Sequence, residues 1–278
     1  MLRQRVIWDD NGTLADESVS LNDYVTGSTA FALVAAQDKL YIGSDLPFNH
    51  RYFDVGTVND QASAVSAEIY NGAAWESAVD VIDETSVGGV TLARSGLINW
   101  GVARTSFWGR ADTTEDVPGL ASLKIYEKYW VRLTWSDDLA AGTVLDHVGL
   151  KFSEDEDLAV YYSDLNTASV KTAFKTGKTD WNDQHYAAAA EIVKNLQTQR
   201  KAYGPEQVLR PDVFKWAAVH KVAAIIYSNF GDDYEDEYNK AVKNYMIEMK
   251  NPQMNLDRDF DGRSDDHDKF THARVTRV

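Results

Sequence analysis

Cysteine is absent from this chain of 278 residues. Its absence excludes disulfide frameworks, thiolate metal sites and cysteine nucleophiles, and it agrees with assembly in a reducing cytosol. Long apolar runs are absent as well, since none approaches the ~20 residues that a membrane-spanning helix needs. Residues 1–5 lead directly into the polar residues 8–12, so no signal peptide is visible. The sequence therefore predicts a protein assembled in the cytoplasm, with no membrane partner.

Basic residues are in short supply. The chain has 28 Lys and Arg against 43 Asp and Glu, which gives a formal net charge of −15. A general nucleic-acid binder needs a basic footprint, so the composition argues against that class. An acidic surface keeps a protein soluble and repels DNA.

Recognisable catalytic motifs are missing. The six histidines are scattered, and none belongs to a His-Glu-x-x-His helix. The sequence has no Gly-x-Ser-x-Gly elbow, no P-loop and no Gly-x-Gly-x-x-Gly after a strand. Acidic residues are too abundant for a glycosidase-like pair to stand out. We therefore expect a protein that is not an enzyme, and we interpret His220 as a hydrogen-bonded core or interface residue.

The first half of the chain has the pattern of short strands. Apolar and aromatic runs alternate with Gly, Asp, Asn or Pro, and Asn71-Gly72 is a strong turn signal. In the clearest run, residues 123–135, apolar side chains alternate with Lys and Arg, as on a strand with one buried face. The runs are residues 29–36, 39–43, 51–57, 64–71, 75–82, 97–102, 123–135 and 143–152. This spacing predicts an antiparallel β-sandwich of the jelly-roll type.

The tryptophans of this half have two interpretations. Exposed rings on a β-sandwich stack on sugars, whereas buried rings pack the core, and core packing is the commoner role. The candidates are Trp75, Trp100, Trp108 and Trp130.

The second half is helical. Apolar residues recur at helical spacing from residue 179 to about 203, from 212 to 230 and from 232 to 249, and the breaks contain Gly or Pro. The fold class is therefore α+β with two domains. The expected parts are an N-terminal arm (1–28), a β-sandwich (29–153), a linker (154–178), a small helical bundle (179–251) and an extended acidic tail (252–278).

The helix at 212–230 is apolar around most of its circumference. Such a helix is buried on several sides, either in a bundle or in an oligomer. The residues that we expect to pack between subunits are Phe214, Trp216, Ile225, Ile226 and Phe230.

The tail contains a motif typical of a calcium loop. Aspartates stand at loop positions one, three, five and nine and Gly262 at position six, while Arg263 would supply a carbonyl at position seven. The twelfth position carries Asp268 where a bidentate Glu is usual, and little helical sequence follows it. The alternative interpretation is an acidic, flexible tail. The candidate ligands for Ca²⁺ are Asp257, Asp259, Asp261, Asp265 and Asp268.

The helical module resembles the head-to-tail adaptor (head completion) proteins of tailed bacteriophages. The resemblance rests on a helix after Asp180-Trp181, a Gly-Pro break, the run from Arg210-Pro211 into residues 223–231, an acidic third helix and the Asp-rich tail. It covers residues 179–268. The β-half is similar to β-sandwich modules of phage structural proteins, on the runs at 51–56, 67–75, 96–100 and 129–133. A β-domain of this size departs from the minimal, mostly helical adaptor.

The resemblance implies a particular assembly. Such adaptors form a ring, commonly of twelve copies, beneath the portal protein in the virion neck, and genomic DNA passes through the ring without sequence-specific binding. The C-terminal extension reaches onto the portal and orders on binding, and other tail or neck proteins are further partners. An acidic lumen would let the DNA slide. The alternatives are a carbohydrate-binding or decorating module of the tail or neck, and a hydrolase with an acidic site.

Overall fold

The computed structural model describes residues 4–24, 29–30, 32–34, 37–103, 105–110, 116–250 and 256–263. The chain has an α+β fold that separates into two compact units. The first unit comprises residues 1–149 together with 259–263, and the second comprises residues 150–258 and 264–278. Within the described ranges, no helix is both long enough and apolar enough to cross a membrane.

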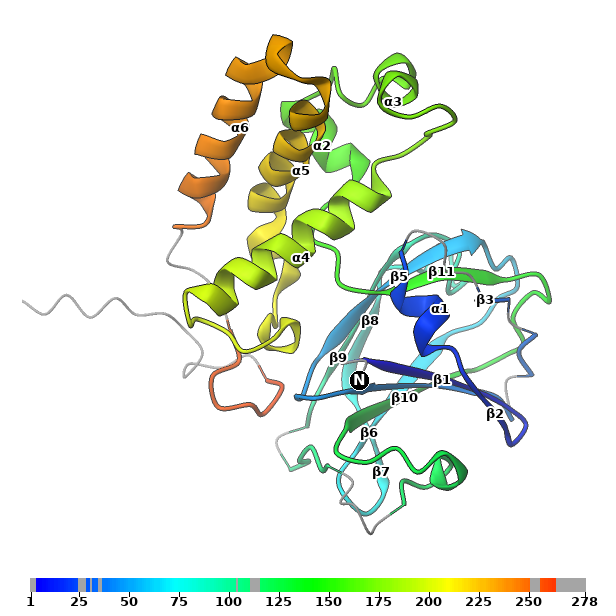
Figure 1. Ribbon diagram of the computed structural model, residues 1–278. Helices are drawn as coiled ribbons and strands as arrows, with labels where there is room; N and C mark the ends of the chain where they lie inside the picture. Colours follow the sequence, from blue (N-terminus) through cyan, green and yellow to red (C-terminus); the bar gives the residue numbers. More distant parts are fainter. Residues whose placement is uncertain are drawn as a thin grey trace, which may run out of the picture. The chain divides into compact units, whose positions relative to one another are not determined.

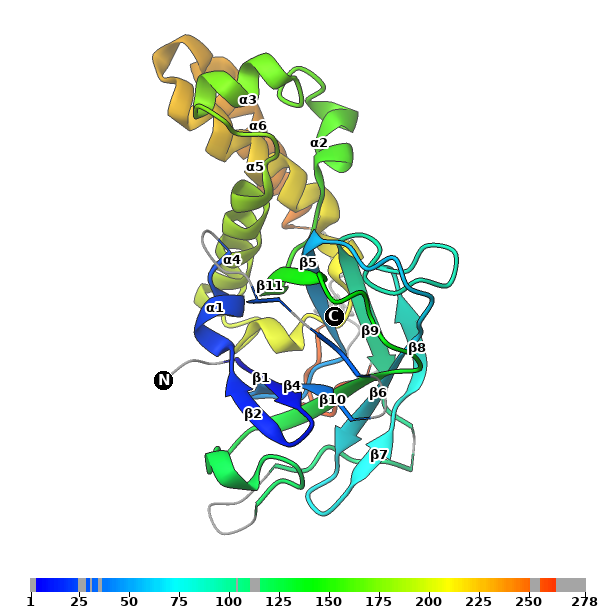
Figure 2. The same cartoon turned by 90° about the vertical axis from the view of Figure 1, so that its right-hand side faces the viewer.

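Two antiparallel sheets form the first unit (Figures 1 and 2). The six-stranded sheet has the order β2 (Thr13–Asp16), β1 (Arg5–Asp10), β4 (Lys39–Ser44), β10 (Tyr129–Trp135), β6 (Val65–Tyr70) and β7 (Trp75–Ser77). The five-stranded sheet has the order β3 (Thr29–Ala30), β11 (Val144–Gly149), β5 (His50–Thr57), β9 (Gly96–Gly101) and β8 (Val79–Asp83). Side chains from both sheets share one buried core, among them Ile42 and Val131 from the first sheet and Phe53 and Ile98 from the second.

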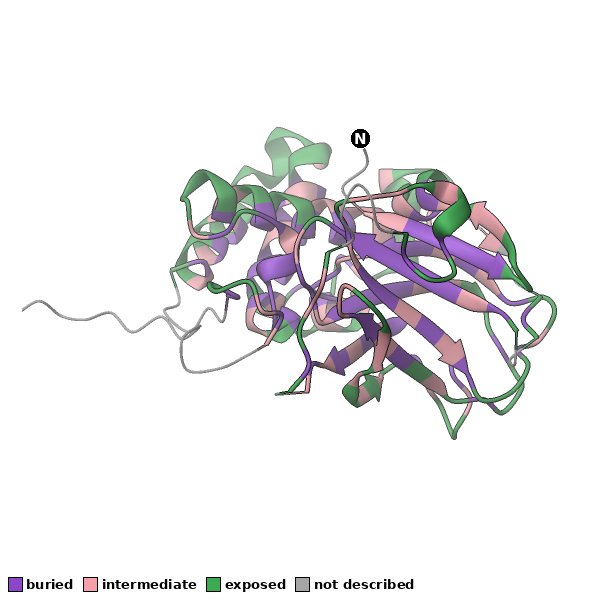
Figure 3. Cartoon of the chain, turned by 90° about the horizontal axis from the view of Figure 1, so that it is seen from below, coloured by how far each residue is buried: buried purple, intermediate pink, exposed green. Residues whose placement is uncertain are grey.

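The six-stranded sheet is covered on its second face as well. In β10, Val131, Leu133 and Trp135 enter the main core, while Trp130 points to the other side. There it lies over Gly43 of β4, where a Cβ atom would come within 2.8 Å of the indole ring. The covering segment is residues 116–127, which includes the short 3₁₀ helix η1 (Ala121–Leu123). Figure 3 shows that some strands of the unit are buried along most of their length, whereas others alternate between buried and less buried positions.

This cover corrects the strand expected at 123–135. Strand β10 begins at Tyr129, and Leu123 and Ile125 belong instead to the segment that packs on the outside of the sheet. Period-two alternation alone does not distinguish one long strand from a strand preceded by an irregular apolar segment. The turn at Asn71-Gly72 is confirmed, because Asn71 Oδ1 accepts hydrogen bonds from the amides of Ala73 and Ala74 between β6 and β7.

Two further boundaries differ from expectation. The N-terminal arm expected at residues 1–28 contains β1, β2 and the short helix α1 (Ser18–Asn22), and β1 pairs with β4 inside the sheet. The run at 75–82 divides into β7 and β8, which belong to different sheets. Strand β1 has four consecutive buried residues because both faces of its sheet are covered, and this removes the alternation that identifies a strand from sequence.

The second unit is a helical bundle around α5 (Lys215–Phe230) (Figure 1). Helix α5 contacts α2 (Asp155–Tyr161), α3 (Ala168–Phe174), α4 (Asn182–Thr198) and α6 (Glu235–Glu248). The short 3₁₀ helices η2 (Pro205–Gln207), η3 (Pro211–Phe214) and η4 (Asp232–Tyr234) lie in the connections. Gly231, with a φ of 82°, ends α5 as predicted. The expected linker at 154–178 is therefore mostly helical and packed, because α2 and α3 cover α5.

The described part of the tail is not extended. Leu256 is fully buried in the core of the helical unit and pairs with Val208, and the amide of Asp257 donates to the carbonyl of Gln207. Within the first unit, the Arg263 guanidinium donates to the carbonyls of Ala103 and Ser106. Residues 264–278 lie outside the described residues.

Candidate functional site

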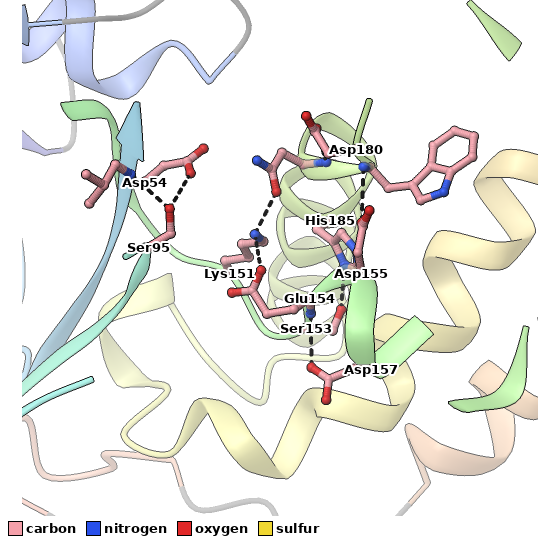
Figure 4. A network of polar contacts seen from close by, with 12 residues as sticks. Asp54, Ser95, Lys151, Ser153, Glu154, Asp155, Asp157, Asp180 and His185 are labelled. Atoms are coloured by element: carbon pink, nitrogen blue, oxygen red, sulfur yellow. Dashed lines mark hydrogen bonds and ion pairs between the residues drawn. The ribbon is translucent and has the colours of Figure 1, made fainter. Parts of the chain in front are cut away.

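The best-developed polar cluster of the helical unit is centred on Asp155, the first residue of α2 (Figure 4). One oxygen, Oδ2, accepts a hydrogen bond from Lys171 Nζ of α3 at 2.6 Å. The other, Oδ1, accepts from the Trp181 amide at 3.1 Å and lies 3.2 Å from His185 Nε2 of α4. A single carboxylate thus joins three helices.

Ser153 extends this cluster. Its hydroxyl lies 2.8 Å from His185 Nδ1, so that Ser153, His185 and Asp155 form a continuous hydrogen-bonded chain (Figure 4). A neutral ring satisfies both contacts when Nε2–H donates to Asp155 and Nδ1 accepts from the Ser153 hydroxyl. This is the proton order of a Ser-His-Asp triad, with the two ring nitrogens exchanged.

The electrostatics keep this chain in one protonation state. Burial lowers the pKa of His185, although the hydrogen bond to Asp155 opposes that effect. Burial by itself would raise the pKa of Asp155, but the hydrogen bonds and charges of His185 and Lys171 outweigh it and hold that pKa at about 2. At neutral pH the ring is therefore neutral and the carboxylate is ionised, as the hydrogen-bonding pattern requires.

Burial decides what this chain of groups does. His185 has no exposed surface and Ser153 is only 4% exposed. A nucleophile must reach its substrate, and a hydroxyl that is almost completely excluded from solvent is not presented to one. Asp155 also serves Lys171 and the Trp181 amide, which are structural partners. We therefore assign the Ser153–His185–Asp155 chain to holding α2, α3 and α4 together.

Lys151 strengthens the same corner of the bundle. Its ammonium, almost fully buried, donates to Glu154 at 2.5 Å and to the side chain of Asn182 at 2.8 Å. Glu154 and Asp157 form a capping box at the start of α2, and Lys215 of α5 donates to Asp157 at 3.0 Å. Three of the four acidic residues of the run 154–157 are thus paired with lysine. This acidic run, at the beginning of the linker expected at 154–178, is an ordered helix start.

Sequence analysis did not identify this cluster. Its groups come from four segments, and no fixed spacing relates Ser153, Asp155, Lys171 and His185. The one relevant sequence feature is His185, which precedes a run of alanines in a predicted helix. This pattern predicts that the histidine is buried, but it does not predict a functional site.

Tyr162 and His220 form a second buried contact in the bundle. The Tyr162 hydroxyl lies 2.8 Å from His220 Nδ1, and burial lowers the pKa of His220. This agrees with the interpretation of His220 as a hydrogen-bonded core residue. On the outside, Tyr161 packs edge-on against Trp216, with ring centroids 5.2 Å apart.

The residues expected to pack between subunits mostly pack within the monomer. Phe214 and Ile226 are buried in the cores of the helical unit, and Ile225 and Phe230 are half-buried against them. Only Trp216 presents substantial surface, at 37% exposed. The apolar circumference of α5 is explained by the helices of its own chain, which corrects the assignment of Phe214 and Ile226 to an oligomer interface.

Part of the predicted calcium loop is brought together. One carboxylate oxygen each from Asp257, Asp259 and Asp261 lies within 4.8 Å of the others. Asp261 Oδ1 also accepts the Arg263 amide at 2.8 Å, and the Arg263 guanidinium lies 3.7 Å from the same carboxylate. A nearby cation weakens the attraction of this cluster for metal ions. Asp265 and Asp268 lie outside the described residues.

The candidate sugar-binding tryptophans are occupied with packing. Trp100 and Trp130 are buried. Trp108 stacks on Phe48 with centroids 5.5 Å apart, and Trp75 Nε1 donates to the carbonyl of Pro118 at 2.9 Å. Trp75 and Trp108 are half-buried, and each ring packs against at least one other aromatic ring.

Two carboxylates approach each other on the five-stranded sheet. Asp54 of β5 accepts a hydrogen bond from Ser95 at 2.9 Å (Figure 4), while burial and the neighbouring Asp54 raise the pKa of Asp146 in β11. The Asp146 carboxylate lies over Gly56, where a Cβ atom would be 2.4 Å away. We attribute the proximity of Asp54 and Asp146 to the close packing of β5 and β11 at Gly56.

Comparison with known proteins does not assign the chain to a family. The sequence matches no protein-family model, and no curated protein matches it significantly.

Proposed function

We propose that this chain is a structural protein of a tailed-phage virion, a head-to-tail adaptor whose copies form a ring beneath the portal. The observation that carries the proposal is the apolar outer surface of the helical unit. Val160 is 65% exposed, Tyr161 57%, Met246 56% and Ile247 55%, although the unit has complete cores of its own. Exposed apolar clusters of this kind mark interaction surfaces.

The character of the polar cluster supports assembly over catalysis. In the cluster with the proton order of a hydrolase, Ser153 and His185 are buried and Asp155 is committed to structural partners. The acidic-site hydrolase alternative would show turnover of a substrate that is lost when one carboxylate is removed. A serine hydrolase built on this cluster would instead react with a serine-directed phosphonylating reagent at Ser153. We expect no labelling of the native chain.

The negative net charge supports a protein that surrounds DNA but does not bind it. A net charge of −15 repels the phosphate backbone, so a ring of such chains lets DNA pass without adhering to it. Ring size, commonly twelve in the proteins that the sequence resembles, follows from the angle between neighbours.

For the first unit we propose a jelly-roll-type sandwich that contacts neighbouring neck, tail or capsid proteins. Two antiparallel sheets around one core support this reading. The carbohydrate-binding alternative has less support, because its four candidate tryptophans pack within the unit.

Electron microscopy of the purified chain, alone and with portal rings, tests the proposal. We expect rings of fixed rotational symmetry that attach coaxially to the portal. Sedimentation over a range of concentrations measures the same assembly in solution. A chain that stays monomeric at every concentration and does not bind portal rings would contradict the adaptor function.

A further inference from the structure

Two helices of the second unit expose apolar faces. Acidic residues border one face, and basic residues border the other. The first, which we name the α2 face, consists of Glu156, Val160, Tyr161 and Trp216. The second, the α6 face, consists of Lys243, Met246, Ile247 and Lys250. Both α2 and α6 pack on α5, so each face is the part of its helix turned away from the bundle.

Helical spacing makes each face continuous. Glu156 and Val160 are four residues apart, and Tyr161 reaches Trp216 at the start of α5. On α6, Lys243 stands three and four residues before Met246 and Ile247, and Lys250 stands four and three residues after them. Ala241, Tyr245 and Met249, on the other side of α6, are buried in the bundle. Among the described residues, Met246 and Ile247 therefore belong to neither core of the helical unit.

Charge distinguishes the two faces. Helix α2 begins with four consecutive acidic residues, of which Glu154, Asp155 and Asp157 are paired with lysines. Glu156 is the exposed member of the run. The exposed charges of the α6 face are Lys243 and Lys250. Two α2 faces would repel each other, and so would two α6 faces, whereas one of each kind is complementary.

We infer that the α2 face of one copy docks on the α6 face of a second copy. The aromatic pair Tyr161–Trp216 packs against Met246 and Ile247, a combination in which a flexible thioether fits aromatic rings well. Glu156 lies among the lysines of the partner. The contact joins different surfaces, so a pair of copies keeps one free α2 face and one free α6 face, and the assembly continues until a ring closes. This inference rests on the proposed adaptor function and names the interface that builds the ring.

Single substitutions on each face test the pairing. Val160→Glu disables the α2 face and Met246→Glu disables the α6 face, and both side chains are more than half exposed, so the fold is retained. We expect each full-length variant to be monomeric at a concentration where the wild-type chain assembles. Tyr203→Glu is the matched control, because Tyr203 is 75% exposed and lies outside both faces. It is expected to assemble like the wild type.

Mixing the two variants gives the decisive result. The Val160→Glu chain keeps its α6 face and the Met246→Glu chain keeps its α2 face, so the mixture is expected to form a one-to-one pair that grows no further. Sedimentation would show twice the mass of the 31.1 kDa chain. Glu156→Lys is expected to weaken wild-type assembly by about threefold, and Lys243→Glu in the same chain to restore it.

The outcomes separate this inference from the proposed function. Assemblies of wild-type size from either single variant would overturn the pairing and leave the adaptor function standing. A mixture that remains monomeric would also overturn the pairing. If the wild-type chain itself neither assembles nor binds portal rings, the proposed function fails and the pairing fails with it.

Discussion

Asp155 shows how one half-buried carboxylate organises a helical bundle. It accepts hydrogen bonds from α3, α4 and the residue before α4, and its pKa is held at about 2. Because its folded pKa lies below the ordinary value of 3.8, Asp155 contributes stability that is present above about pH 4 and is lost as the pH falls through about 2.

Asp155→Asn is expected to destabilise the chain by about 2–3 kcal/mol at pH 7, because Lys171 is left buried without a counter-charge. The difference between variant and wild type should shrink towards pH 2. Urea unfolding at a series of pH values measures both effects. Asp212→Asn is the control, because Asp212 and its partner Arg210 are both more than half exposed, and it should cost less than ~1 kcal/mol. Equal losses from the two substitutions would contradict the central role of Asp155.

His50 makes the first unit sensitive to acid. The side chain is fully buried, and burial together with Arg51 lowers its pKa to about 3. The unfolded chain therefore binds a proton near pH 6.5 that the folded chain does not bind until about pH 3. Stability falls as the pH is lowered through this range, by at most about 1.4 kcal/mol per pH unit.

His50→Leu is expected to reduce this slope between pH 6.5 and 3, even if loss of the 2.8 Å contact between His50 Nδ1 and Asn49 lowers the stability at pH 7. The measurement is the free energy of unfolding of the first unit against pH. Parallel curves for the variant and the wild type would show that His50 is not the group responsible.

At the scale of elements, the segment 256–263 is anchored by close packing. Gly262 has a φ of 72°, and a Cβ atom there would lie 2.6 Å from Trp108 Nε1. Gly88 has a similar φ of 61° but no atom within 4 Å of its Cβ position. The two glycines carry the same backbone restriction and differ in their surroundings.

Gly262→Ala is therefore expected to destabilise the first unit more than Gly88→Ala. Each substitution costs about 1 kcal/mol for the left-handed backbone, and only Gly262→Ala adds displacement of Trp108, for about a further 1–3 kcal/mol. Thermal unfolding monitored by tryptophan fluorescence measures the difference. Equal effects would mean that the contact with Trp108 is unimportant.

The acidic loop gives a test of the calcium hypothesis. If Asp257, Asp259 and Asp261 ligate calcium, titration calorimetry of the full chain is expected to give a binding heat that Asp259→Ala abolishes. The neighbouring Arg263 predicts weak affinity, and Arg263→Gln is expected to increase it. Equal heats from the wild type and Asp259→Ala would contradict the site.

At the scale of the whole molecule, the position of a truncation matters. Removal of residues 264–278 is expected to leave the stability unchanged but to abolish attachment to portal rings. Removal of residues 253–278 is expected to cost about 2–5 kcal/mol as well, because Leu256 is buried in the helical core. Urea unfolding and co-sedimentation with portal rings separate the two effects. Normal attachment after the shorter truncation would contradict a portal-binding role for the last residues.

The sequence by itself determined the class of the fold and the main helices. Gly231 and the apolar spacing predict where α5 ends, and Asn71-Gly72 predicts a turn, because these signals act over a few neighbouring residues. Only the tertiary structure decided that residues 116–127 cover a sheet, and that α5 is enclosed by its own chain. It also decided that Ser153, Asp155 and His185 meet, and that Ser153 and His185 are buried there. Those outcomes depend on contacts between segments that are far apart in the chain. Local sequence patterns do not predict such contacts.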